Sequence, residues 1–366
     1  MKRHVLLFVK ALFGKTSLPS PINRRFYPSR KDLRSMIDRR RRKLVQGLLD
    51  QELLMAKVKE WKEKDSNVFI HVRLSASVKR PVVEDDQEEG LIKIEDQPFL
   101  FVYQNAWQKY MLQRYGGEMV FLDATYRTTK YALPLFFVCV HANSGYYVVG
   151  AFITQKEDSD SISEALDIIK GLNPSWKPKS FMIDASEIEM MSIIKTFPGS
   201  SIFICDFHRK QAWRRWTSAS KNGVMQQQDE ILSLLNGIAE SLTEEEFKHQ
   251  ISKLRNSPLW ESKLNLQKYI EKEWLSKDKH KMWVWAYRGD MLTFVVNTNN
   301  GVEAQNKVFK YDYLAPYRVK TISGLMSVLI DDFFLDAHRE YLESNVTMCI
   351  GWRSGGEFVP EELHHR

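Results

Sequence analysis

GGEMVFLDATYRTT, residues 116–129, sets an apolar run directly before a single carboxylate, Asp123. Residues 119–122 are typical of a buried strand, and small or hydroxylated residues follow the acid. A strand of this kind delivers its acid to the edge of a sheet. A lone Asp in such a place is more often a turn former or a helix cap. Its role therefore depends on whether other carboxylates occupy comparable positions.

Composition limits the class of protein. The 366 residues are 43% hydrophobic, enough for a sizeable core, and the formal net charge of +7 favours a polyanionic partner without requiring one. Three cysteines are too few for a disulfide framework and suit a reducing compartment. No run approaches the roughly 18 apolar residues of a membrane span. The mixed basic and apolar start, residues 1–14, indicates an amphipathic helix or a disordered end rather than a signal peptide.

An α/β sheet is predicted around this segment. Residues 133–141 and 146–154 are further strands, and the Asn-Ser-Gly sequence at 143–145 is a hairpin signal between them. The pattern then predicts a helix over 159–171, a strand over 180–183, a helix from 187 to about 194 and a strand over 201–205. A three-strand meander followed by helix, strand, helix and strand is the order of a ribonuclease-H-like mixed sheet.

Two more carboxylates occupy informative positions. Asp184 directly follows the strand predicted at 180–183, and Glu303 lies in the first turns of a helix that begins after the polar residues 297–300. Between them, residues 226–285 show a helical apolar pattern throughout. We expect these residues to form a helical insertion before the last acid.

Two Asp residues at strand ends and a Glu on a later helix suit a two-metal phosphodiester site. Mg²⁺ and Mn²⁺ prefer hard carboxylate oxygens as ligands. We therefore expect Asp123 to bridge two ions, and Asp184 and Glu303 to hold one each. The sequence offers no convincing Ser/His/Asp or Cys/His catalytic set and no phosphate-binding Gly loop.

Cys205 and His208 stand two residues apart after the strand predicted at 201–205. They would supply two ligands to a zinc ion, whereas a structural zinc site takes four, and no partner pair of similar spacing is present. A buried Cys205, with His208 capping or orienting a neighbour, is the favoured alternative.

Basic side chains gather in three places. The segment 24–43 is strongly basic, and a nuclear-import signal or a solvated helix face explains it as well as DNA contact does. A second group lies on the aromatic helix after Cys205, where Trp213 and Trp216 either meet DNA or pack in a core. A third follows Glu303 at helical spacing. The predicted DNA contacts are Arg39, Arg40, Arg41, Arg42, Lys43, Arg209, Lys210, Arg214, Arg215, Lys307 and Lys310.

Four motifs together resemble the Mutator-like (MULE) transposase family. They read FLDATY at 121–126, MID at 182–184, CDFH at 205–208 and TNNGVEAQNK at 298–307, and the resemblance covers residues from about 99 to 342. It implies a ribonuclease-H-like DDE core with Asp123, Asp184 and Glu303 as the catalytic triad. Cys205 and His208 would be the family's C-x-x-H pair. The resemblance also implies metal-dependent cut-and-paste transposition of DNA in the nucleus, by a dimer or larger assembly acting on transposon ends and target DNA.

Five regions are expected along the chain. A helical pattern at 44–61 and a strand at 68–72 precede an acidic linker at 80–90. The regions are a basic N-terminal region with this linker (1–95), the first part of the core (96–220), the helical insertion (221–290), the last part of the core with the Glu303 helix (291–345) and a tail (346–366).

The sequence departs from the family in its zinc modules. No Cys precedes residue 99 and only Cys349 follows Glu303, so neither the N-terminal zinc domain nor the C-terminal SWIM finger of many relatives fits here. This departure is typical of a fragment or a domesticated descendant. The alternatives to an active transposase are a DNA-binding or regulatory protein without turnover, and a folded relic with no role on DNA.

Overall fold

The computed structural model describes residues 48–81, 92–131, 133–288, 300–315 and 321–353. Outside these residues lie the predicted N-terminal start, the basic run at 39–43, residues 82–90 of the predicted linker at 80–90 and residues 354–366 of the predicted tail. None of the described helices is long and apolar enough to cross a membrane.

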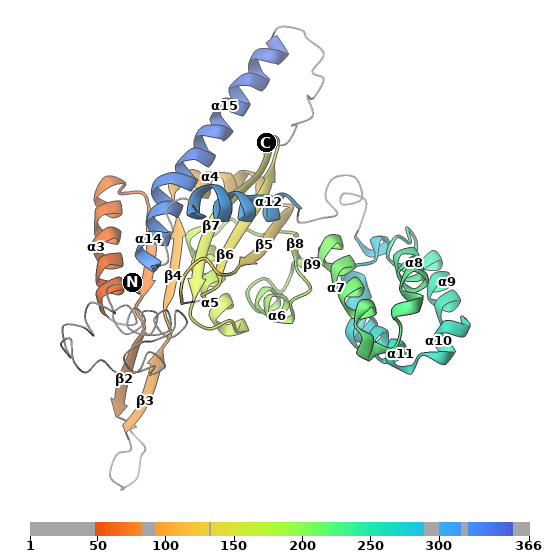
Figure 1. Cartoon of the computed structure of the whole chain (residues 1–366). Coiled ribbons are helices and arrows are strands. Elements are labelled where there is room, and N and C mark those ends of the chain that lie inside the picture. The colour runs from red at the N-terminus through yellow and green to blue at the C-terminus, as the bar shows by residue number, and fades with distance from the viewer. Residues whose placement is uncertain (1–47, 82–91, 132, 289–299, 316–320, 354–366) are drawn as a thin grey trace, which may run out of the picture.

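Seven of the described strands form one mixed sheet (Figure 1). Its order is β1 (Phe69–Arg73), β4 (Leu100–Gln104), β7 (Gly145–Thr154), β6 (Leu135–Ala142), β5 (Met119–Thr125), β8 (Ser180–Ile183) and β9 (Ser201–Ile204). The first five strands pair antiparallel, and β5, β8 and β9 pair parallel. The meander β5–β6–β7 with β8 and β9 beside β5 has ribonuclease-H-like topology, as the sequence predicts.

Helices cover both faces of this sheet. On one face, alternate strand residues such as Phe121 and Phe137 pack against helices that come from both ends of the chain. These helices are α3 (Leu48–Lys64), α12 (Asn300–Val308), η6 (Phe309–Leu314), α14 (Ile322–Ser327) and η7 (Val328–Phe333). Because α3 and β1 contribute Leu54 and Ile70 to this core, the sheet and the segment before the predicted linker share one hydrophobic core.

The opposite face carries Val120, Leu122 and Phe136, which alternate with the residues above, as side chains of a strand must. Its helices are α4 (Ala106–Tyr115), α5 (Ser159–Leu172), α6 (Glu187–Thr196) and, through Tyr341, α15 (Phe334–Arg353). Asn105, Asp158 and Ser186 cap α4, α5 and α6 by accepting a backbone N–H. The expected helix at 159–171 and strand at 180–183 are confirmed as α5 and β8.

A separate group of helices follows the sheet and has its own core (Figure 1). It consists of α7 (Asp206–Ser218), η1 (Ser220–Asn222), η2 (Met225–Gln227), α8 (Gln228–Ala239), α9 (Glu244–Arg255), α10 (Pro258–Ser262), α11 (Leu264–Tyr269), η3 (Ile270–Leu275), η4 (Ser276–Met282) and η5 (Trp285–Tyr287). Trp213, Trp274 and Trp283 meet edge to face in its interior. Residues 226–285 are therefore mainly helical, as their apolar pattern indicates.

The hairpin of β2 (Ala76–Pro81) and β3 (Ile92–Gln97) forms a second, two-stranded sheet. Figure 1 shows it extending away from the main sheet, on the side opposite to α15.

Candidate active site

The ends of β5 and β8 bring two acids together. These strands are parallel neighbours with Phe121 opposite Met182, and both of these side chains face the core that α12 covers. Asp123 and Asp184 each lie two residues further on, so the period of two places both on that face and at the same level. Asp123 is buried, with 4% of its surface exposed, while the side chain of Asp184 is 33% exposed.

Helix α12 brings the third acid to this point from far along the chain. Val302 is buried in the shared core, and α12 contacts β5 and β7. Gln305 donates a hydrogen bond to the carbonyl oxygen of Tyr146, with an N···O distance of 3.0 Å, and Asn306 donates one to Oδ2 of Asp123. These contacts fix Glu303, whose side chain is 17% exposed, over the strand ends.

His208 lies between the second and third acids. Its Nδ1 atom is 2.5 Å from Oδ1 of Asp184, and its Nε2 atom is 3.1 Å from Oε1 of Glu303. Both contacts are close ion pairs when the imidazole is protonated. The imidazole therefore ties together two carboxylates that lie 119 positions apart (303 minus 184) in the sequence.

The electrostatics of the site follow from this crowding. Burial first, and then the charge of Asp184, raises the pKa of Asp123 to about 7. Burial lowers the pKa of His208, but its contacts with Asp184 and Cys205 outweigh burial and raise that pKa to about 10. The positive charges of His208 and, less strongly, Lys310 favour the ionised form of Asp123. Arg127 adds its charge near Lys310 and adopts left-handed backbone geometry with φ of 61°, which is uncommon for a residue other than glycine.

The donor set fits divalent Mg²⁺ or Mn²⁺ by its chemistry, because it consists of carboxylate oxygens crowded together without enough positive charge. As the side chains stand, no group of three or more His, Cys, Asp or Glu residues in the described parts of the chain is arranged to hold a metal ion. Asp184 and Glu303 instead form ion pairs with His208.

The two residues of the C-x-x-H pair lie in different surroundings. Cys205 is fully buried on the core face shared with Phe121. His208 is turned toward Asp184 and Glu303 and also interacts with Cys205. The alternative in which Cys205 is buried and His208 orients its neighbours describes this geometry, and zinc binding by the pair stays a prediction.

The predicted DNA contacts fall into three groups. Arg214, Arg215 and Lys307 are exposed, Lys310 is half-buried, and Lys210 lies 3.6 Å from Glu240 in an ion pair. Arg209 must be removed from the predicted set, because it is fully buried, pairs with Asp206 and lies over the ring of Trp213. Trp213 belongs to the core of the helical group and Trp216 stacks on Tyr269. The run at 39–43 lies outside the described residues.

Two residues of the site were missed in the sequence. Asn306 is a buried partner of Asp123, three residues after Glu303. Glu189 of α6 is buried, and burial together with Asp184 and Asp123 raises its pKa well above the ordinary value. Helical periodicity could have predicted its burial, because Glu189 lies on the same helix face as the buried residues Ser192, Ile193 and Thr196.

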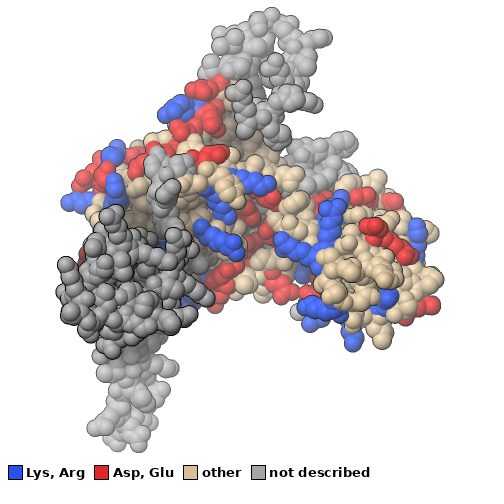
Figure 2. Space-filling view, in the orientation of Figure 1, with Lys and Arg blue, Asp and Glu red and all other residues tan. Residues whose placement is uncertain are grey.

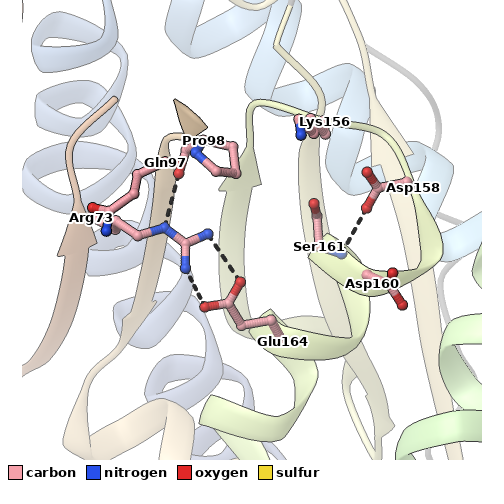
Figure 3. A pocket seen from close by; sticks show the side chains of 8 residues that line it. All are labelled: Arg73, Gln97, Pro98, Lys156, Asp158, Asp160, Ser161 and Glu164. Carbon is pink, nitrogen blue, oxygen red and sulfur yellow. Dashed lines mark hydrogen bonds and ion pairs between the residues drawn. The ribbon is translucent and has the colours of Figure 1, made fainter. Parts of the chain in front are cut away.

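A cavity of about 480 Å³ lies elsewhere, between β1, the end of β3 and the N-terminal part of α5 (Figure 3). Arg73 on its wall donates to both carboxylate oxygens of Glu164 and to the carbonyl oxygen of Pro98. Asp158 accepts the backbone N–H of Ser161. Since Arg73 is already engaged within the protein, the acid cluster is the stronger candidate site.

The fold and the acids at its strand ends define an α/β protein of the ribonuclease-H-like class. A family model described as the RNaseH-like domain of zinc finger SWIM domain-containing protein 1/3 matches residues 85–203. The matched residues include Asp123 and Asp184 and end before Cys205 and Glu303. No match was found among curated proteins.

Gly301 allows α12 to approach the sheet closely. A Cβ atom at this position would lie 1.9 Å from Cδ2 of Tyr146, whose ring packs edge to face on Phe121. Gly301→Ala is therefore expected to shift the start of α12, and Glu303 with it, and to lower the free energy of unfolding by about 1–3 kcal/mol. Urea denaturation measures the loss.

Gly171 provides the matched control, because it is also helical and a Cβ added there meets nothing within 4 Å. Gly171→Ala should be neutral or stabilising by up to about 1 kcal/mol. Equal stability of the Gly301→Ala protein and the wild type would contradict the close approach of α12.

The stability of the metal-free protein should fall as pH rises. The pKa of Asp123 is raised on folding from 3.8 to about 7, so ionisation of this acid costs stability across that interval. The pKa of His208 is raised from 6.5 to about 10, so its stabilising charge is complete below pH 6.5 and is lost as pH rises through about 10. Both shifts act in the same direction.

Urea unfolding in EDTA at about pH 5 and about pH 9 tests this dependence. The wild type should lose stability toward the higher pH, and Asp123→Asn should flatten the part of the curve below about pH 7. A wild-type curve that rises over the whole interval would show that these two groups do not control it.

Proposed function

We propose that this chain is a Mutator-like DDE transposase core, or a domesticated derivative, that cleaves DNA and transfers a strand. The observation that supports this function is the convergence of Asp123, Asp184 and Glu303 around His208, from two strand ends and a helix beyond the helical group. Two acids at neighbouring strand ends of a ribonuclease-H-like sheet, with a third on a helix packed over them, are suited to phosphodiester chemistry.

Asp123, Asp184 and Glu303 would hold Mg²⁺ or Mn²⁺. The bound ions would activate the attacking oxygen and neutralise the leaving oxygen. The protein's own part is to position the acids. Asn306 orients Asp123, and α12 holds Glu303 against the strands through Gln305 and Tyr146. His208 must release Asp184 and Glu303 before these acids can bind ions.

The charge distribution around the acids favours a nucleic acid as the substrate. Figure 2 shows Lys and Arg side chains on both sides of acidic side chains, where the sheet meets the helical group. The side chain of Lys307 is 70% exposed, and its Nζ atom lies 3.9 Å from Oε2 of Glu303. The charge of Lys310 favours the ionised form of Asp123. Such positive charge around an acidic centre attracts a phosphate backbone while leaving the metal ligands negative. We also propose that the protein acts in the nucleus as a homo-oligomer, and that its substrates are transposon ends and target DNA.

A non-catalytic DNA-binding or regulatory protein is the second candidate. The specific observation in its favour is that His208 engages two of the three acids within the protein itself. An imidazole held there by both carboxylates would occupy the space and supply the charge that metal ions otherwise supply.

DNA nicking by the purified full chain separates these functions. Supercoiled plasmid incubated with Mg²⁺ or Mn²⁺ should become relaxed or linear, and EDTA should prevent the change. If the plasmid stays intact while a mobility-shift assay shows metal-independent binding of duplex DNA, the regulatory function holds and the nuclease is excluded.

A further inference from the structure

Helix α6 buries an acid and exposes apolar side chains, the reverse of what burial energetics favours. Glu189 is only 4% exposed, whereas Ile188, Met191 and Ile194 of the same helix are 37%, 52% and 44% exposed. Burying an ionisable side chain costs free energy unless partners compensate it. The orientation of α6 therefore requires a reason other than apolar burial.

The ordinary structural roles of a Glu at this position do not explain it. Glu189 is the third residue after the cap Ser186, where a Glu side chain usually accepts the N-cap backbone N–H and completes a capping box. Its backbone N–H does donate to Ser186 Oγ, at an N···O distance of 3.3 Å. The reciprocal bond is not formed, in contrast to α4, where Gln108 makes both bonds. The buried Oε2 atom of Glu189 has no hydrogen-bond partner among the described residues.

The surroundings of Glu189 are those of the candidate active site. The charges that act most strongly on it are those of Asp184 and Asp123, and the basic group among its electrostatic neighbours is His208. Glu189 and Asp184 are also among the charges that raise the pKa of Tyr126, three residues after Asp123. Helix α6 begins at Glu187, shortly after Asp184, so Glu189 lies in the first helical turn beyond the end of β8.

We infer that Glu189 is a fourth carboxylate of the metal site, which supplies a ligand oxygen to a divalent cation on the Asp184 side. This inference rests on the proposed metal-binding function of the triad. An unpartnered, buried carboxylate oxygen beside two other acids is a ready ligand for a hard cation. The cation would also remove the repulsion among acids that the metal-free protein tolerates.

Mn²⁺ binding by the full chain, followed by isothermal titration calorimetry in the absence of DNA, tests this role. Glu189→Gln keeps the size of the side chain and removes its charge, and should weaken Mn²⁺ binding about 10–100-fold. The matched control is Glu187→Gln, because Glu187 lies on the same helix, has a 74% exposed side chain and forms an ion pair with Lys279 at 3.8 Å. The control should bind Mn²⁺ as the wild type does.

The outcomes separate the inference from the proposed function. Wild-type affinity in Glu189→Gln, with binding lost in Asp123→Asn, overturns the role of Glu189 and leaves the triad intact. Absence of Mn²⁺ binding by the wild type overturns both. Mn²⁺ binding that Glu189→Gln weakens, in a protein that never nicks plasmid, supports the four-acid site and counts against turnover.

A folding defect would not leave the question open. Should Glu189→Gln fail to fold by circular dichroism, Glu189→Asp keeps the charge but withdraws the oxygen by one methylene. This variant should bind Mn²⁺ several-fold more weakly than the wild type, and equal affinity would overturn the inference.

Discussion

Asp123→Asn is expected to abolish metal-dependent DNA nicking, lowering the rate by about 10³-fold or more, which corresponds to about 4 kcal/mol in the barrier. Asp123 is the most buried acid of the proposed triad, lies on β5 next to β8, and feels the charges of both Asp184 and Glu303. A neutral amide in its place removes the charge that would bridge two cations.

The same substitution should leave folding intact. The carbonyl oxygen of the new Asn can still accept the hydrogen bond of Asn306. Loss of a buried charge should also relieve repulsion from Asp184 and Glu303, so the metal-free variant should be at least as stable as the wild type. Lost activity with retained stability distinguishes a chemical role of Asp123 from a structural one.

Plasmid nicking in Mg²⁺ or Mn²⁺, with urea unfolding of the same preparations, measures both effects. Asp160→Asn is the control, because the side chain of Asp160 is 85% exposed and pairs only with Lys195 at the surface. This control should nick at the wild-type rate. Metal-dependent nicking by Asp123→Asn at the wild-type rate would place the activity elsewhere in the chain, or in a contaminant.

Asp206→Ala is expected to lower the free energy of unfolding by about 3–5 kcal/mol. Asp206 is a buried acid at the start of α7, and its Oδ1 atom lies 2.9 Å from Arg288 Nη2 and 3.3 Å from Arg209 Nη2. Its Oδ2 atom accepts the indole N–H of Trp285, with an N···O distance of 3.0 Å. Removal of this one carboxylate takes the ion-pair partner from two buried guanidinium groups.

This cluster also joins the helical group to the sheet. Arg288 follows η5 and donates to the carbonyl oxygen of Ile204, the last residue of β9, with an N···O distance of 2.8 Å. Arg209 lies over the ring of Trp213, with its guanidinium carbon 4.4 Å from the ring centroid. Loss of Asp206 should therefore loosen the end of the helical group, from which the chain continues to α12 and Glu303.

Urea denaturation measures the loss, and limited proteolysis should detect earlier cleavage near η5. Glu240→Ala is the control, since Glu240 pairs with Lys210 across 3.6 Å at an exposed site, where an ion pair contributes about 0–1 kcal/mol. A loss below about 1 kcal/mol in Asp206→Ala would mean that water or rearrangement compensates the two arginines.

Much of the sheet was predictable because its signals are local. The apolar run before Asp123, the hairpin signal before β7 and the four residues of β8 follow the alternation and turn chemistry that short segments carry by themselves. By contrast, the pairing of β1 with β4 has no local signal. A five-residue strand beyond a linker can join any exposed edge, and only the packing of α3 and β1 into the shared core settles the choice.

The sequence could not assign partners to buried polar residues. Arg209 was predicted to contact DNA because a basic aromatic helix usually presents its charges, yet its guanidinium lies beside Asp206 in the interior. His208 was assigned to a possible zinc pair because of its spacing from Cys205. The acids that His208 contacts follow β8 and lie on α12. These segments are distant in the sequence, so no local pattern predicts the contacts.

The sequence by itself determined that acids stand at the ends of β5 and β8 and that a third follows a helical insertion, because apolar periodicity and its termination are properties of neighbouring residues. Only the tertiary structure decided that these acids meet, that His208 lies between two of them, and that Glu189 is buried beside them. The physical reason is that pKa shifts, ion pairs and unpartnered oxygens depend on distances between side chains from separate elements. Packing across the sheet sets those distances.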